Sequence, residues 1–415
     1  RMNFLLLRRV TNMKLKNLLK TISVFCLLTF VAEIPVYANK SMPFGCPPGY
    51  TATTIYRMVL GPDGNFCIQE DRDCVLDPVV LTGGKFFLPV QDVKFPEPGT
   101  PSNSTLEFTR HYSNQDGFSG AFGNGWSSLL DLTLTFSMVM DGNIIRGGSV
   151  IVLRNENGMV IPFVLTKDTP RVAGRPIKFT DGQEELTWVP APNPKFDTEG
   201  TISYKRPHGT TYKAELNPFV HFKSINKLNE NRITIQYDAF GVMNRLTDRN
   251  GNSLSFQYGE NKKVSRMSDQ TGRAWRYSYD ALGNLTQVVD WVGRVTRYTY
   301  ADPIDPSNIT TVIDPLGFKT AYAYNANDQV TKLTRPDGST LTFSFDNLLG
   351  TSTMKDEHGK KWHYEYVKIG LVTLIADPTG GIWKYTYNPD TNLMTSMTNP
   401  RNRKTTYTYH ADQTL

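Results

Sequence analysis

The feature that most constrains this chain is a regular spacing of 21 residues across its second half. Gly251, Gly272 and Gly293 are each 21 residues apart. After one step of 24 residues, the spacing of 21 resumes at Gly317, Gly338, Gly359 and Gly380. Self-similarity at a fixed period is the mark of a repeat array. A residue that recurs in every unit is therefore first interpreted as building that unit.

Pairs of aromatic residues keep the same spacing. Each pair has one residue between its members, and the pairs are Phe256/Tyr258, Tyr277/Tyr279, Tyr298/Tyr300, Tyr322/Tyr324, Phe343/Phe345, Tyr364/Tyr366, Tyr385/Tyr387 and Tyr407/Tyr409. Residues two apart in a strand face the same side. Each pair thus predicts a strand with one aromatic face, and the eight pairs predict eight units in register, after a degenerate unit at Ile235 and Tyr237.

Two short segments in each unit have the composition of tight turns. In one unit these are Asp280–Gly283 and Asp290–Gly293, with an alternating run at 285–289 between them. Asp first and Gly last is the preference of a type I turn. Each unit then holds two strands and two turns, and the units form an antiparallel meander. We interpret one set of residues as repeat-defining and structural: Tyr277, Tyr279, Asp280, Gly283, Asp290 and Gly293.

Residues 77–215 lack this spacing but also predict strands. Short alternating runs bounded by Gly, Pro, Asn and Asp occur there, such as "STLEFTRHY" and "DLTLTFSM". We therefore expect an all-β protein, with a smaller β domain over 77–215 and the array over 216–415. The stretch Ala173–Gly200 is richer in Pro and turn residues and is predicted to be a loop-rich margin.

The first 38 residues predict a secretory signal peptide. Lysines precede the apolar run "TISVFCLLTFVA" (Thr21–Ala32), and small or compact residues stand at Val36 and Ala38, before a predicted cleavage site. A membrane anchor is the alternative, but about a dozen apolar residues are fewer than the ~20 that a bilayer requires. This segment carries +5 of the net charge of +6, so little basic charge remains to favour nucleic-acid binding elsewhere. We expect an exported protein without a stable transmembrane anchor.

Residues 39–76 form a leader whose fold the sequence does not indicate. It contains Cys46, Cys67 and Cys74. After export two of these cysteines could form a disulfide, which leaves one over. Zinc binding is the alternative, and the wide spacing of the cysteines does not favour it.

Residues suited to catalysis or metal binding are few. The closest histidines, His358 and His363, lie in one unit with no recognisable third ligand, and His111 is interpreted as structural. The recurring aspartates are explained as turn residues. No helix follows the glycine-rich "GAFGNGW", as a phosphate site would require. We therefore predict no catalytic residue, no cofactor and no metal site.

The aromatic residues allow a second interpretation. Rows of Tyr and Trp can line a sugar-binding face, and Trp275, Trp291, Trp362 and Trp383 vary in position against the tyrosine pairs. Packing of one aromatic face inside the sheet accounts for the rows equally and is favoured. Trp362 and Trp383 are kept as candidate glycan contacts.

The motif "YxYDxxGxLxxxxDxxG", as in Tyr277–Gly293, resembles the Rhs/YD-repeat proteins. "DPVVLTGGKFFLP", "LEFTRHYS" and "GAFGNGWSSLLDLTLTF" are similar to the domain that commonly precedes such repeats, so the resemblance covers about 77–415. It implies a β-sheet that spirals into a hollow shell around a C-terminal toxin used in bacterial competition. The family's self-cleaving core segment and toxin have no counterpart in this chain.

Three hypotheses follow. The first is the non-catalytic shell portion of a secreted bacterial protein, whose partner is a toxin domain absent from this chain. The second is a surface protein that binds cell-wall or surface glycans through its repeats. The third, an enzyme, has no supporting residues. Since Leu415 aligns with Leu285 inside a unit, we expect the chain to be a fragment or the product of a truncated gene.

Overall fold

The computed structural model describes residues 58–60, 66–68, 75–76, 79–97, 100–114, 117–181, 184–192, 199–206, 210–216, 219–227, 232–367, 370–389 and 391–409. The predicted signal peptide over 1–38, Cys46 and Cys74 lie outside the described residues. Within them the protein is built of β-strands, with one short 3-10 helix at Leu129–Asp131 and no α-helix. The prediction of an all-β fold is therefore confirmed. No helix of the described part is long and apolar enough to cross a membrane.

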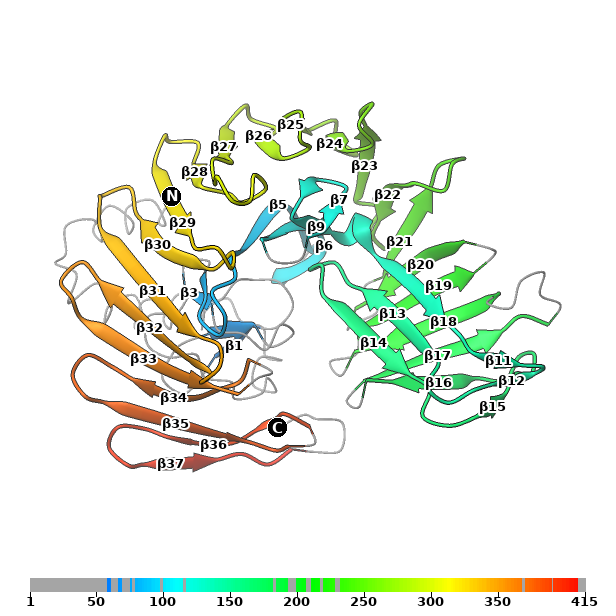
Figure 1. Cartoon of the computed structure of the whole chain (residues 1–415). Coiled ribbons are helices and arrows are strands. Elements are labelled where there is room, and N and C mark those ends of the chain that lie inside the picture. The colour runs from blue at the N-terminus through cyan, green and yellow to red at the C-terminus, as the bar shows by residue number, and fades with distance from the viewer. Residues whose placement is uncertain are drawn as a thin grey trace.

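One antiparallel sheet of 25 strands dominates the fold (Figure 1). Its first strands precede the 21-residue repeats: β10 (Thr133–Ser137), β13 (Val150–Arg154), β14 (Val160–Val164), β16 (Ile177–Thr180), β17 (Glu185–Pro190), β18 (Gly200–Lys205), β19 (Thr211–Leu216) and β20 (Val220–Asn226). The Pro-rich stretch Ala173–Gly200 was predicted as a loop-rich margin, and that prediction was wrong. It contributes β16 and β17, because its alternating residues Ile177, Phe179, Leu186 and Trp188 are buried on one face.

The repeat array continues the same sheet as a meander. Its strands are β21 (Arg232–Tyr237), β22 (Met243–Thr247), β23 (Ser253–Tyr258), β24 (Val264–Asp269), β25 (Ala274–Tyr279), β26 (Leu285–Val289), β27 (Val295–Thr299), β28 (Thr311–Ile313), β29 (Lys319–Tyr324), β30 (Val330–Thr334), β31 (Thr340–Asp346), β32 (Thr351–Asp356), β33 (Lys361–Tyr366), β34 (Val372–Ala376), β35 (Ile382–Tyr387), β36 (Met394–Thr398) and β37 (Lys404–Thr406). The sheet passes residues 215 and 216 without a break. The division between residues 215 and 216 stays a prediction from the sequence pattern.

The remaining strands form small sheets. A three-stranded sheet contains β5 (Phe87–Glu97), β6 (Thr100–Ser113) and β9 (Trp126–Ser128), and another contains β11 (Met140–Asp141), β12 (Ile144–Ile145) and β15 (Thr169–Pro170). Two-stranded sheets pair β1 (Met58–Leu60) with β2 (Phe66–Ile68), β3 (Val75–Leu76) with β4 (Val79–Val80), and β7 (Ser119–Gly120) with β8 (Gly123–Asn124). Cys67 lies in β2.

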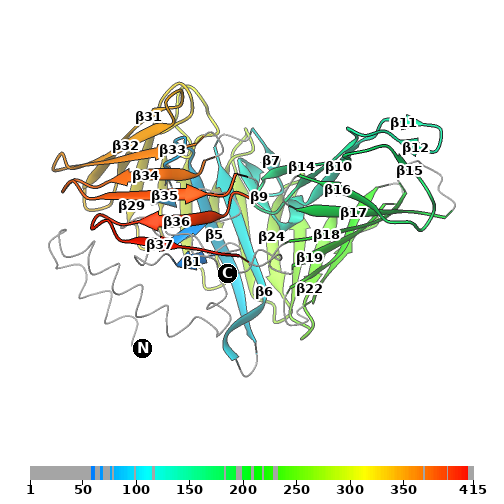
Figure 2. The ribbon, with the colours of Figure 1, turned by 90° about the horizontal axis from the view of Figure 1, so that it is seen from below.

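The large sheet curves into a horseshoe, and β5, β6 and β9 lie inside its arc (Figure 1). Seen from below, β6 runs through the interior between the two arms (Figure 2). Strand alternation decides which side chains face inward. In β25, Trp275 and Tyr277 are buried, whereas Arg276 and Ser278 are exposed. The core therefore lies between the concave face of the sheet and the segment enclosed by it.

Candidate functional site: the concave face and the segment docked in it

The repeat-defining tyrosines lie on the concave face and have two different roles. Tyr277 is buried, and its hydroxyl donates a hydrogen bond of 3.0 Å to the Asp92 carboxylate of β5. Tyr279 donates a hydrogen bond of 2.7 Å to the backbone carbonyl of Val264, the first residue of the previous unit's second strand. Burial raises the pKa of both phenols, which keeps them protonated as donors.

The bond made by Tyr279 recurs along the array. The second tyrosine of a pair donates to the carbonyl fifteen residues earlier in eight places, at Tyr237, Tyr258, Tyr279, Tyr300, Tyr324, Tyr366, Tyr387 and Tyr409. In six of them a β-bulge stands immediately before that tyrosine. Phe345 cannot donate, and β31 pairs with β32 there without a bulge. The hydroxyl and the bulge therefore belong to one device that joins consecutive units.

The aspartates and glycines of the unit form the predicted turns. Asp280 Oδ1 accepts hydrogen bonds from the backbone N–H groups of Leu282 at 3.0 Å and Asn284 at 2.9 Å. Gly283 closes the turn with a φ of 87°, a left-handed conformation that glycine adopts without strain. Asp290 and Gly293 repeat this arrangement at the opposite edge of the sheet. We call the edge that contains Asp280–Gly283 the first rim and the edge that contains Asp290–Gly293 the second rim.

The described residues of 79–132, here called the docked segment, pack against the concave face in phase with the repeat. Four of its aromatic rings each meet the first aromatic of one unit, and the four units are consecutive. The ring centroids lie 5.1 Å apart for Phe108–Phe256, 4.9 Å for Phe122–Tyr277, 5.3 Å for Trp126–Tyr298 and 4.4 Å for Phe86–Tyr322. Such tilted or edge-on pairs stabilise a contact beyond the area that they bury.

A buried ion pair lies at the centre of this contact. Arg110 is fully buried and donates through Nε and Nη2 to the two oxygens of Asp92, at 2.6 and 2.8 Å. Its guanidinium lies over the rings of Trp126 and Tyr277 at 4.7 and 5.3 Å. Burial opposes the charge of Arg110, but the Asp92 carboxylate outweighs it and holds the arginine pKa above its ordinary value. Tyr277 of the array donates a hydrogen bond to the Asp92 carboxylate of this ion pair. The ion pair therefore fixes the docked segment against the unit that contains Tyr277.

Backbone bonds tie the docked segment to the first rim. The carbonyl of Ala121 accepts from Val264 N–H at 2.8 Å, and the carbonyl of Gly283 accepts from Asn124 N–H at 3.2 Å. Further along the array, Val330 N–H donates to the carbonyl of Gly84 at 2.8 Å. The docked segment therefore closes the inner side of this rim across several units.

The insertion that lengthens one repeat step to 24 residues has a specific contact. Tyr112 donates through its hydroxyl to the carbonyl of Ser307 at 2.6 Å and accepts from the N–H of Ile309 at 3.1 Å. Asn114 donates to the carbonyl of Asp328 one unit later. The Pro-rich stretch Ala301–Asn308 thus receives the end of β6. The sequence alone showed only the step of 24 residues at this place.

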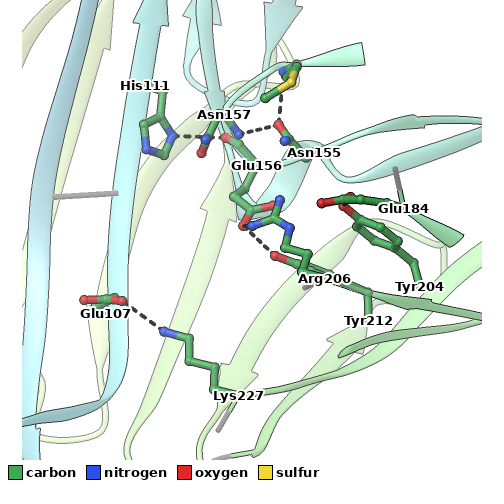
Figure 3. Close-up of polar contacts among 11 residues, drawn as sticks. Glu107, His111, Asn155, Glu156, Asn157, Glu184, Tyr204, Arg206, Tyr212 and Lys227 are labelled. Atoms are coloured by element: carbon green, nitrogen blue, oxygen red, sulfur yellow. Dashed lines mark hydrogen bonds and ion pairs between the residues drawn. The ribbon is translucent and has the colours of Figure 1, made fainter. Parts of the chain in front are cut away.

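A second polar cluster joins the docked segment to the earlier part of the sheet (Figure 3). His111 Nδ1 lies 3.0 Å from the backbone carbonyl of Glu156, and burial lowers the pKa of His111 to about 4. Burial opposes the charge of Glu156, but Arg206 and a 2.6 Å hydrogen bond from Tyr212 outweigh it and lower its pKa. At the margin of this region Lys227 forms an ion pair of 2.9 Å with Glu107. His111 is therefore a buried packing residue, as predicted.

The other candidate residues do not gather into one place. His358 is exposed in a turn of the second rim, and His363 lies on the convex face of β33, opposite Ala376. Among the described residues no group of three His, Cys, Asp or Glu side chains could hold a metal ion. The recurring aspartates are occupied by the turns that they cap.

The tryptophans differ from their prediction in one respect. Trp275, Trp362 and Trp383 hold one fixed position, two residues before the first tyrosine, so they do not vary against the pairs. Trp362 and Trp383 are partly buried against the core on the concave face. Trp291 is the exception, because it stands in a turn with 48% of its surface exposed. Glycan contact by Trp362 and Trp383 stays a prediction, and their orientation favours packing.

Comparisons with known proteins identify the array. Residues 207–415 match the family model of the teneurin YD-shell, and residues 76–163 match a domain of unknown function, DUF6531. No curated protein sequence matches the chain.

Solved structures of TcdB2-TccC3-Cdc42 and of TcdB2-TccC3 are similar at 10% and 11% identity, each with a TM-score of 0.35. The similarity covers 79% of this chain and 22% and 23% of those chains, so the chain spans less than a quarter of their length. The teneurin YD-shell model covers half of the sequence, and the repeats that it matches are those whose tyrosine bonds join unit to unit. The chain therefore belongs to the teneurin YD-shell family and is an Rhs/YD-repeat protein.

Proposed function

We propose that this chain is the wall and one closed rim of a shell that encloses a toxin domain. One observation carries the proposal: the docked segment meets four consecutive units through their first aromatic residues and closes the inner side of the first rim. A curved sheet that only bound a ligand on its outer surface would not require a segment fixed inside it. The aspartates of the repeats serve turns, which fits a structural role.

The enclosed partner is proposed to be a C-terminal domain of the complete gene product. This rests on the family match and on the concave face, whose tyrosines continue along β33 and β35 beyond the four docked units. We further propose that the protein is exported and acts in bacterial competition. The export proposal rests on the basic and apolar pattern of the first 38 residues.

Limited proteolysis of the complete gene product tests the proposal. Sequencing the coding DNA past the codon for Leu415 first establishes which domain follows. We expect that domain to resist protease while the shell is closed, and to be cleaved at least tenfold faster when Gly123→Ala loosens the docked segment. Gly117→Ala is the matched control, because Gly117 shares a positive φ, of 56°, but a Cβ there meets no atom within 4 Å. Equal cleavage in all three proteins would contradict enclosure.

A further inference from the structure

Charge is segregated in the repeat array. Across strands β21–β37 the acidic residues are Asp269, Asp346, Asp356 and Glu365. The three aspartates are each the last residue of a strand and accept hydrogen bonds from the following turn. Only Glu365 places a carboxylate within the body of a strand. Carboxylates of the strands therefore lie mostly at the rims, where they accept hydrogen bonds from the backbone N–H groups of the turns.

Basic residues occupy the middle of the convex face. Arg245, Arg266, Arg276 and Arg297 are each the third residue of a strand, in β22, β24, β25 and β27. Each lies beside an inward-facing core residue, for example Arg276 between Trp275 and Tyr277, so its own side chain faces outward. Three of the four are exposed and Arg266 is half-buried. We call this set the arginine row.

The arginine row has an unfavourable internal arrangement. Arg266 and Arg276 are direct cross-strand partners, and like charges in that position destabilise a sheet. No carboxylate of the described residues forms an ion pair with any of the four guanidinium groups. The Nε of Arg266 is buried without a hydrogen-bond partner. Arg245 Nη2 donates a bond of 2.9 Å to Ser253 Oγ, so the row keeps its charge without a carboxylate partner but does not leave every donor free.

The earlier part of the same convex face is arranged differently. There Lys178 pairs with Glu185 and Lys223 with Glu215, both at 3.0 Å. Ordinary solubility is met by such mixed charges. The single sign of the arginine row is therefore a local property of the array and not of the whole sheet.

We propose that the convex face over β22–β27 binds a linear phosphodiester polymer along the arginine row. The planar guanidinium group matches phosphate oxygens in a two-point contact. Neighbouring strands lie about 4.8 Å apart, so arginines one or two strands apart stand about 5 to 10 Å apart. A flexible chain with one phosphate in each monomer can follow that spacing across the strands.

The same face argues against two other polyanions. All aromatic residues of β22–β27 are turned to the concave side, so no ring of these strands stands beside the arginines to stack on a nucleic-acid base. They are Phe256, Tyr258, Trp275, Tyr277, Tyr279 and Tyr298. The exposed Trp291 stands in the turn between β26 and β27, at the second rim. None of the large apolar residues that the described part exposes lies in these strands, although Leu282, Trp291 and Val292 are exposed in turns at the rims. The middle of the face therefore offers no apolar side chain to insert into a lipid surface.

Binding of poly(glycerol phosphate) to the full chain tests the proposal, with titration at rising salt. The test variant replaces the row with uncharged glutamine: Arg245→Gln, Arg266→Gln, Arg276→Gln and Arg297→Gln. The control removes equal charge from the earlier strands: Lys178→Gln, Lys205→Gln, Lys213→Gln and Lys223→Gln. We expect the wild type and the control to bind with a salt-dependent affinity, and the test variant to bind about tenfold or more weakly.

Folding is checked by circular dichroism and thermal melting. If the fourfold variant does not fold, the pair Arg276→Gln with Arg297→Gln replaces it, because both side chains are exposed and neither holds a hydrogen bond that the fold needs. Equal loss in the lysine control would overturn the proposal, as would an absence of binding by the wild type. Tighter binding of single-stranded DNA, or of phosphatidylglycerol vesicles, than of poly(glycerol phosphate) would also overturn it.

Discussion

The hydroxyl of Tyr279 donates a 2.7 Å hydrogen bond to the backbone carbonyl of Val264, fifteen residues earlier. Val264 begins β24 and Tyr279 ends β25, so the bond crosses from one unit of the array to the next. Val264 lies opposite Tyr258, where the register of the β23–β24 pairing shifts. The tyrosine of the motif is thereby explained as a joint between units.

Replacing Tyr279 with Phe should test that joint. The ring stays in place but the carbonyl of Val264 loses its donor, which should lower the free energy of unfolding by about 1 kcal/mol. Chemical denaturation measures the change. A variant as stable as the wild type would show that the hydroxyl does not join the units.

Replacing Asp280 with Ala should weaken the first-rim turn. Two backbone N–H groups lose their acceptor, and we expect a loss of about 1–2 kcal/mol in the free energy of unfolding. Asp280→Asn is a partial control, since its amide oxygen can still accept both backbone bonds. Its NH2 group cannot accept the 2.9 Å bond that Asn284 Nδ2 donates to Asp280 Oδ2. If the asparagine variant loses as much stability as the alanine variant, the two backbone bonds to Oδ1 are not what stabilises the turn, and the carboxylate charge or its bond with Asn284 is.

Gly123→Ala should loosen the docked segment. Gly123 has a φ of 104°, and a Cβ there would lie 2.5 Å from the carbonyl oxygen of Gly283 on the first rim. Either the backbone of the segment or the turn must move, at a cost of about 1–3 kcal/mol. We expect faster proteolysis within residues 79–132 than in Gly117→Ala, where a Cβ meets open space. Equal rates would show that close approach to Gly283 does not hold the segment.

The stability of the protein should depend on pH through His111. Burial lowers its pKa from 6.5 to about 4, so between these values the unfolded chain binds more protons and stability falls as pH falls. The slope is at most about 1.4 kcal/mol per pH unit. Unfolding free energies of the wild type and His111→Gln are measured from pH 4 to 7. The wild type should show this fall in stability toward low pH, and His111→Gln should lack it.

Asp131 provides the opposing control for that experiment. Burial raises its pKa from 3.8 to about 6, so its contribution to stability falls as pH rises through that range. In the wild type, the contributions of His111 and Asp131 to the pH dependence of stability partly cancel, so the His111→Gln variant is needed to separate them. A pH profile unchanged by His111→Gln would contradict the assignment of a buried neutral imidazole.

The sequence by itself determined the units of the array. Its 21-residue spacing specified the strand at 285–289, which is β26 as observed, and the Asp–Gly turns at both rims. These features are local: a turn is closed by an aspartate and a glycine three positions apart, and strand alternation depends on neighbouring side chains. The same reasoning failed for Ala173–Gly200, because proline and turn residues concealed two strands whose burial depends on the rest of the sheet.

Only the tertiary structure decided what lies inside the curve. Phe86, Phe108, Phe122 and Trp126 read in sequence as ordinary apolar residues of short strands. In the structure these four residues meet the first aromatics of four consecutive units. The curvature of the sheet makes these contacts possible, because it brings together residues more than 100 positions apart. The arginine row likewise appears only when strand register places Arg266 opposite Arg276. The spacing of residues along the chain determines the strands and turns of each unit. The contacts across the sheet depend on how many units assemble and on how strongly the sheet curves.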